Sequence, residues 1–187
     1  MNEVSDKYPL KTDWWGESTF SWALFGPEET EDGFYRYRYA LGRRWDKAED
    51  SLLFIMLNPS TADALQDDPT VRKCRKYAKK WGYGEVLVGN IFGLRSPDPD
   101  HLYQANNPVG PDNDHIIQNM LLPKADDVIV AWGNHGEHLD RSQEVLDSYL
   151  KQYDVQALEL NKSGEPSHPL YLPNDTEPFS YEPEYVR

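Results

Sequence analysis

Polar residues gather where apolar segments of this sequence stop. The loop at residues 58–63 reads NPSTAD and follows the apolar run SLLFIML at residues 51–57. It supplies an amide, two hydroxyls and a carboxylate around a stiffening proline: Asn58, Pro59, Ser60, Thr61 and Asp63. Asn, Ser and Asp are also ordinary turn formers, so each residue alone has a purely structural interpretation. Their grouping in one loop favours a binding or catalytic site.

Asn90 interrupts a second apolar run, EVLVGNIF at residues 85–92. An unsatisfied buried amide costs about 1–3 kcal/mol, so this side chain should have a partner. Either the protein supplies that partner and Asn90 is structural, or a ligand supplies it and the amide reads a base-like edge. We count Phe92 and Arg95 as further candidate substrate-binding residues. Arg95 suits a phosphate or carboxylate, with a surface salt bridge as the alternative.

His168 lies in a constrained Ser-His-Pro segment, and histidine commonly donates a proton to a leaving group. A structural role is the alternative. Gly133 follows a third apolar run, DVIVAW at residues 127–132, and completes the set of candidate binding residues.

Other motifs give little support for a metal or a cofactor. His135 and His138 in NHGEH have no helical frame, and the single cysteine, Cys74, leaves no cysteine-based zinc site. We therefore predict no metal. The glycines form no phosphate-cradling fingerprint, so we predict neither triphosphate hydrolysis nor a dinucleotide cofactor.

The pattern of apolar residues predicts the elements that position these residues. Residues 51–57, 85–92, 127–132 and 155–160 are typical of buried strands. Helices are predicted at 69–81, 113–122 and 140–153, the first capped by Asp67 or Asp68 with Pro69 at its first position. Strands that alternate with helices imply an α/β fold around a mainly parallel four-stranded sheet with right-handed crossovers. Ligands of such sheets bind beyond the carboxyl ends of the strands, so the candidate residues should share one rim.

The 187 residues fit one domain, which we place at residues 16–173. Residues 20–25 and 34–45 suggest a β-hairpin at one edge of the sheet, around an acidic turn at 27–33. Residues 1–15 are expected to form a loose arm, and residues 174–187 a loose acidic tail. No signal peptide or membrane span is recognisable, which favours the cytoplasm and no membrane partner. No protein partner is evident.

The net charge of -13, from 32 acidic and 19 basic residues, repels nucleic-acid phosphates unless basic groups are concentrated locally. It argues against a protein that coats DNA. The predicted helix at 69–81 carries a basic stripe that either contacts phosphates or is simply solvated: Arg72, Lys73, Arg75, Lys76, Lys79 and Lys80. At 13% aromatic residues, some rings should lie at a surface or cleft, where they can stack on bases.

Several segments together resemble an uncharacterised family of bacteria, archaea and phages, over roughly residues 36–173: FIMLNPSTADA, DDPTVRKC, WGYG, VGNIFGLRSP, NPVGPDND, VAWGNHG and HPLYL. That family carries no known activity. A more distant resemblance is to the uracil-DNA glycosylase superfamily, through MLNPS, GN with a downstream RSP, VAWG and HP in matching order. It implies a three-layer α/β domain.

The second resemblance also implies roles and a function. Asn58 would position water, Asn90 would read the base, and His168 would stabilise negative charge on the departing base, with Asp63 or, second, Asp68 assisting the sugar and the water. The implied activity is a glycosylase-like hydrolase that cleaves the N-glycosidic bond of a nucleobase in nucleic acid, DNA included, or in a nucleotide. Two alternatives stay open: a non-catalytic binder of a modified base, nucleotide or nucleic acid, and a small-metabolite hydrolase or transferase that uses Ser60 or Asp63.

Overall fold

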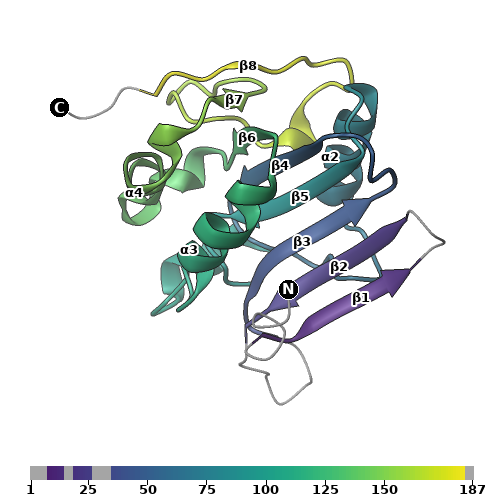
Figure 1. Cartoon of the computed structure of the whole chain (residues 1–187). Coiled ribbons are helices and arrows are strands. Elements are labelled where there is room, and N and C mark those ends of the chain that lie inside the picture. Colours follow the sequence, from purple (N-terminus) through teal and green to yellow (C-terminus); the bar gives the residue numbers. More distant parts are fainter. Residues whose placement is uncertain (1–7, 15–18, 27–34, 184–187) are drawn as a thin grey trace.

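An eight-stranded mixed sheet runs through the protein in the order β1-β2-β3-β5-β4-β6-β7-β8 (Figure 1). The computed structural model describes residues 8–14, 19–26 and 35–183. The centre of the sheet consists of parallel strands β5 (Glu85–Asn90), β4 (Ser51–Met56), β6 (Asp127–Ala131) and β7 (Val155–Ala157). The predicted α/β class is confirmed, but the sheet is wider and more mixed than the predicted four strands.

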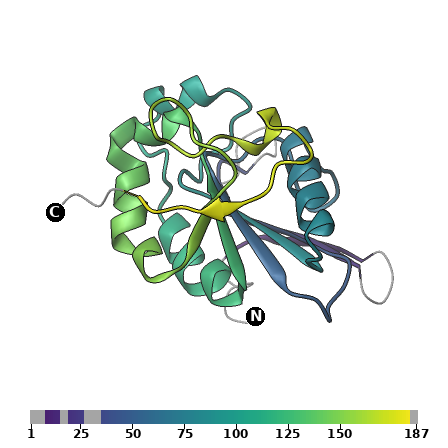
Figure 2. The same cartoon turned by 90° about the horizontal axis from the view of Figure 1, so that it is seen from above.

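Helices cover both faces of the sheet (Figure 2). On one side lies α2 (Pro69–Lys80), which begins after the capping side chain of Asp68 with Pro69 in its first turn, as predicted. Its buried residues Val71, Cys74 and Tyr77 recur at helical spacing and pack on the sheet.

The opposite face carries α3 (Asn113–Ile116) and α4 (Arg141–Ser148). The first continues as a π-helical turn (Ile117–Leu121) and a short 3-10 turn (Leu122–Lys124), so the helix predicted at 113–122 forms with irregular geometry. Other 3-10 helices are η1 (Pro99–Gln104), η4 (Asn134–Asp140), η5 (Leu150–Gln152) and η6 (Pro169–Tyr171). None of the helices in the described ranges is long and apolar enough to cross a membrane.

The N-terminal strands lie towards one edge of the sheet, as predicted, but they are three strands and not a two-stranded hairpin. Strands β2 (Phe20–Phe25) and β3 (Arg38–Arg44) pair antiparallel as predicted, although the turn at 27–33 lies outside the described residues. However, β3 also pairs with β5, and β1 (Leu10–Trp14) pairs with β2 in a segment expected to be a loose arm. Consequently β3 is an internal strand.

The C-terminal segment is also more ordered than expected. Lys73 Nζ donates to the carbonyl of Leu172 at 2.6 Å and to Asn174 Oδ1 at 2.7 Å, which fixes the segment along α2. The chain then crosses the molecule to β8 (Phe179–Ser180), which pairs antiparallel with β7 (Figure 1). Residues 174–183 are therefore part of the fold.

Candidate functional site

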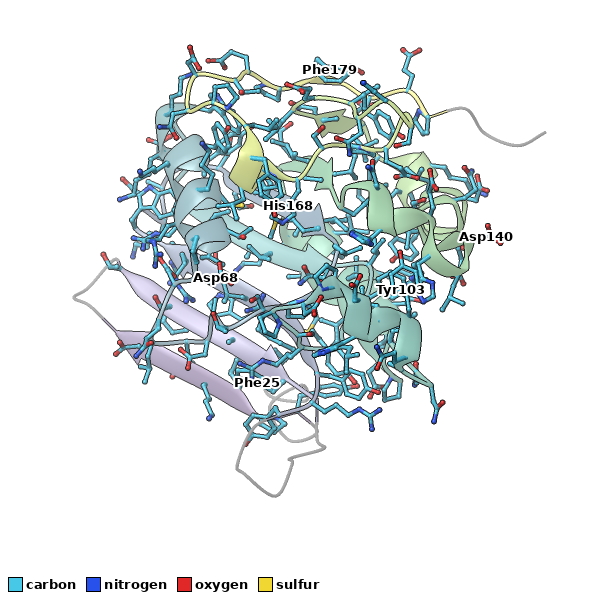
Figure 3. The ribbon with its side chains drawn as sticks, turned by 180° about the vertical axis from the view of Figure 1, so that it is seen from behind. Phe25, Asp68, Tyr103, Asp140, His168 and Phe179 are labelled. Atoms are coloured by element: carbon cyan, nitrogen blue, oxygen red, sulfur yellow. The ribbon has the colours of Figure 1, made fainter. Side chains whose placement is uncertain are left out.

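A cavity of about 640 Å³ lies at the carboxyl ends of the parallel strands. Five of the ten first-choice candidates from the sequence line it: Asn58, Ser60, Asn90, Gly133 and His168. They come from the exits of β4, β5 and β6 and from the segment before η6, so the predicted common rim exists. Figure 3 shows His168 beside α2, whose first turn follows Asp68.

Asn90 ends β5 and is buried, with only 1% of its surface exposed. Neither its side-chain nitrogen nor its side-chain oxygen has a hydrogen-bond partner among the described residues. Its backbone carbonyl, in contrast, accepts a hydrogen bond from Asn113 Nδ2 at 2.8 Å. The protein therefore leaves a buried donor and a buried acceptor unsatisfied at the wall of the cavity, at a cost of about 1–3 kcal/mol per group.

The Asn58 side chain is fixed by backbone carbonyls. Its Nδ2 donates to Ser96 O at 2.9 Å and to Pro59 O at 3.2 Å, with Leu94 O at 3.4 Å. Because these neighbours are all acceptors, the amide nitrogen must face them. Asn58 Oδ1, with no partner among the described residues, is left as an acceptor for water or a ligand N–H.

His168 is held as a neutral imidazole. Burial lowers its pKa from 6.5 to about 4, although the nearby Asp68 carboxylate acts in the opposite direction. Its Nδ1 accepts a hydrogen bond from Leu170 N at 3.4 Å, which assigns the ring proton to Nε2. Gly133, with φ of +74°, lies close by, since a Cβ built on it would be 3.8 Å from His168 Cβ. His168 therefore offers a neutral N–H donor near physiological pH.

Asp68, which ranked second to Asp63 in the sequence, is the buried carboxylate of the cavity lining. It also caps α2, because its Oδ1 accepts from Val71 N at 2.8 Å, while Oδ2 accepts from Ala62 N at 3.4 Å. Asp63 does not line the cavity. Its carboxylate accepts from the backbone of Leu65 and Gln66 and stabilises the turn that follows NPSTA.

Four of the substrate-binding candidates do not line the cavity: Pro59, Thr61, Phe92 and Arg95. Pro59 is buried and Thr61 is exposed. Phe92 is fully buried in the core on the α3 and α4 face, with its ring centroid 5.7 Å from that of His138. Arg95 places its Cζ 5.2 Å from the centroid of the Phe25 ring and donates to Tyr35 O at 3.4 Å.

The cavity lining also contains residues that the sequence analysis did not select, among them Arg38, Trp132 and Tyr171. Arg38 is 2% exposed, although its strand was expected at an edge where charged side chains reach solvent. Only the position of β3 inside the sheet buries it. Tyr171 is 82% exposed and its ring centroid lies 5.7 Å from that of His168, so this ring is available for stacking.

The basic stripe of α2 is engaged in contacts within the protein. Besides the Lys73 contacts, Arg75 pairs with Asp67 at 2.5 Å, and Lys80 pairs with Glu177. Lys79 Nζ lies 5.0 Å from the centroid of the Trp45 ring. Much of this charge is therefore used to hold neighbouring segments in place. Within the described ranges, no group of three or more His, Cys, Asp or Glu residues is arranged to hold a metal ion.

Comparison with known proteins gives one family. The model of a family described as "Protein of unknown function (DUF1643)" matches residues 38–170. The matched range begins at Arg38 and includes all the candidate site residues between Asn58 and His168. No curated protein and no solved structure matches the chain.

Proposed function

The chain belongs to the DUF1643 family of proteins of unknown function, and we propose from its own cavity that it is a glycosylase-like hydrolase. The proposed reaction cleaves the N-glycosidic bond between a nucleobase and its sugar. The observation that carries the proposal is the unsatisfied amide of Asn90 at the cavity wall. A carboxamide offers one donor and one acceptor side by side, which complements the N–H and C=O groups on the edge of a base.

His168 supports the hydrolytic step. As the glycosidic bond breaks, its electron pair moves to the base, so negative charge develops there. A neutral Nε2–H can donate a hydrogen bond to that charge, and a preorganised donor of this kind is worth roughly 10²–10³-fold in rate. The low pKa of His168 suits this role, because the ring stays neutral and acts by hydrogen bonding.

The remaining groups would serve the sugar and the attacking water. Asn58 Oδ1 accepts a hydrogen bond from the water whose oxygen bonds to the anomeric carbon. Asp68 contributes negative charge opposite the positive charge that develops on the sugar. It takes this role in preference to Asp63, because Asp63 does not line the cavity.

A second candidate function is binding of a modified base, nucleotide or nucleic acid without turnover. One observation favours it: both carboxylate oxygens of Asp68 already accept a backbone N–H group, so the carboxylate is partly occupied by contacts within the protein and is less available to a water molecule. The third alternative, a serine-type hydrolase acting through Ser60, has less support, since the Ser60 hydroxyl makes no hydrogen bond to a base among the described residues.

The direct test is release of free base, measured by mass spectrometry, from modified and unmodified DNA, RNA, nucleosides and nucleotides. We expect release by the wild type to fall roughly 10²–10³-fold in His168→Ala. The matched control His115→Ala removes an exposed histidine of α3 and should keep full activity. Binding without release by the folded wild type would favour the second candidate, and neither binding nor release would contradict both.

A further inference from the structure

Three arginine side chains are buried among the described residues, and two of them are ion-paired. Arg43 Nε contacts Asp67 Oδ1 at 2.8 Å. Arg141 pairs with Asp114, and with Glu144 at 2.9 Å. Arg38 is the exception, since no described carboxylate lies within ion-pair distance of it.

The guanidinium of Arg38 is also poorly satisfied by hydrogen bonds. Nη1 donates to the carbonyl of Ala62 at 2.6 Å, whereas the buried Nε has no hydrogen-bond partner among residues 8–14, 19–26 and 35–183. Burial lowers the pKa of Arg38 to about 10, and the more distant Asp68 opposes this only in part. A buried charge without a counter-ion is costly, so buried charges are normally paired or bound to a ligand. Because Arg38 lines the cavity, a ligand anion can reach it.

We infer that Arg38 forms an anion subsite of this cavity, and that the ligand is a small nucleotide whose phosphate binds Arg38 while its base meets Asn90. This inference rests on the proposed function for the identity of the base-binding end. The two residues lie on neighbouring strands, β3 and β5, at the same rim, where Arg38 N donates to Gly93 O at 3.0 Å. The planar guanidinium fork matches phosphate oxygens, which accept two parallel hydrogen bonds.

The surroundings favour a free nucleotide over a nucleic-acid chain. Arg38 is 2% exposed, so a terminal phosphate inside the cavity reaches it more readily than a phosphate within a continuous strand. The net charge of -13 repels polyanions, and the α2 residues Lys73, Arg75 and Lys80 are engaged within the protein. Binding of a single phosphate requires only one buried cation, and Arg38 provides it.

The test compares ligands that differ by one phosphate. The wild type is titrated in a calorimeter with common and modified nucleosides, their 5′-monophosphates, inorganic phosphate and a short single-stranded oligonucleotide. We expect a monophosphate to bind about tenfold or more tightly than its nucleoside. Arg38→Met, which removes the charge at similar length, should abolish this difference, and Arg38→Lys should retain part of it. Arg72→Met, at an exposed arginine of α2, is the matched control and should behave like the wild type.

The comparison within the wild type remains informative even if Arg38→Met does not fold. Equal affinity for nucleosides and monophosphates would overturn the anion subsite while leaving the proposed function intact. Tighter binding of the oligonucleotide than of any monophosphate would overturn the small-nucleotide assignment. Phosphate-dependent binding that Arg38→Lys weakens, without any base release, would support the subsite and contradict the hydrolase.

Discussion

Asn58 and Asn90 carry the same side chain at the ends of two adjacent parallel strands, yet the protein uses them in opposite ways. Backbone carbonyls hold Asn58 Nδ2, which fixes the loop after β4 and leaves Oδ1 as an acceptor. The side chain of Asn90 has no hydrogen-bond partner in the part of the chain that the structure describes. The first amide is therefore anchored by the fold, whereas the second is buried at an energetic cost that a ligand in the cavity would offset.

At the residue scale, His168 should make stability depend on pH. Its native pKa of about 4 lies below the unfolded value near 6.5, so the unfolded chain binds this proton first as the pH falls. The contribution is fully present above about pH 6.5 and is lost towards pH 4, with a magnitude of about 1–3 kcal/mol. Urea unfolding at about pH 7 and about pH 5 should show a smaller loss of stability for His168→Gln than for the wild type. An identical pH dependence in both proteins would contradict the assignment of His168 as a neutral imidazole in the native protein.

The sequence identified Asn58, Asn90 and His168 because polar residues at the ends of apolar runs are conspicuous. It could not identify Arg38, since its burial depends on β3 being covered on both sides by other strands. Likewise, no feature of the local sequence indicates which of Asp63 and Asp68 lines the cavity. The first caps a turn outside the cavity and the second caps a helix whose first turn faces it.

At the element scale, Asp68 has two roles, because it caps the first turn of α2 and also lines the cavity. Asp68→Ala removes the cap and should lower the free energy of unfolding by about 1 kcal/mol. Asp68→Asn keeps a side-chain oxygen for the cap and should retain nearly all the stability, but it removes the negative charge and should reduce base release. Urea unfolding and the mass-spectrometric assay on both variants check this. Full activity in Asp68→Asn would show that the charge is not used.

The central elements were predictable because each carries a strong local signal. The apolar run of β4 and the Asp68-Pro69 start of α2 are examples. Strand β1 was missed because its sequence, LKTDW, contains no apolar run, and β8 was missed because it has only two residues. The position of β8 also depends on pairing with β7, which lies far away in the sequence. The stability of such edge strands comes from tertiary contacts, which a local pattern does not contain.

At the scale of the whole molecule, the C-terminal segment engages two of the lysines of α2, Lys73 and Lys80. Glu177 pairs with Lys80, Asn174 accepts from Lys73, and Tyr181 N donates to Val155 O at 2.9 Å beyond β8. Lys73 and Lys80 therefore hold the C-terminal segment in place, whereas without these contacts their charges would be available to phosphates. The arrangement agrees with the overall negative charge in disfavouring long polyanions as ligands.

Truncation after Pro173 tests this docking. Loss of the α2 contacts and of β8 should lower the melting temperature by roughly 3–8 °C, because about 1–2 kcal/mol corresponds to that range in a protein of this size. Scanning calorimetry of the truncated and full chains measures the shift. An unchanged melting temperature would mean that the segment adds nothing to the fold.

The central claim is that Asn90 is retained for a ligand, and the Asn90→Leu variant tests it most directly. Leucine has the same number of side-chain heavy atoms as asparagine and the same branch at Cγ, and it has no polar group to leave unsatisfied, so the free energy of unfolding should stay constant or rise by up to about 1 kcal/mol. Base release, measured by mass spectrometry on the same folded samples, should be lost. Retained release in a variant that is destabilised by about 1–3 kcal/mol would identify Asn90 as a structural residue and contradict the account.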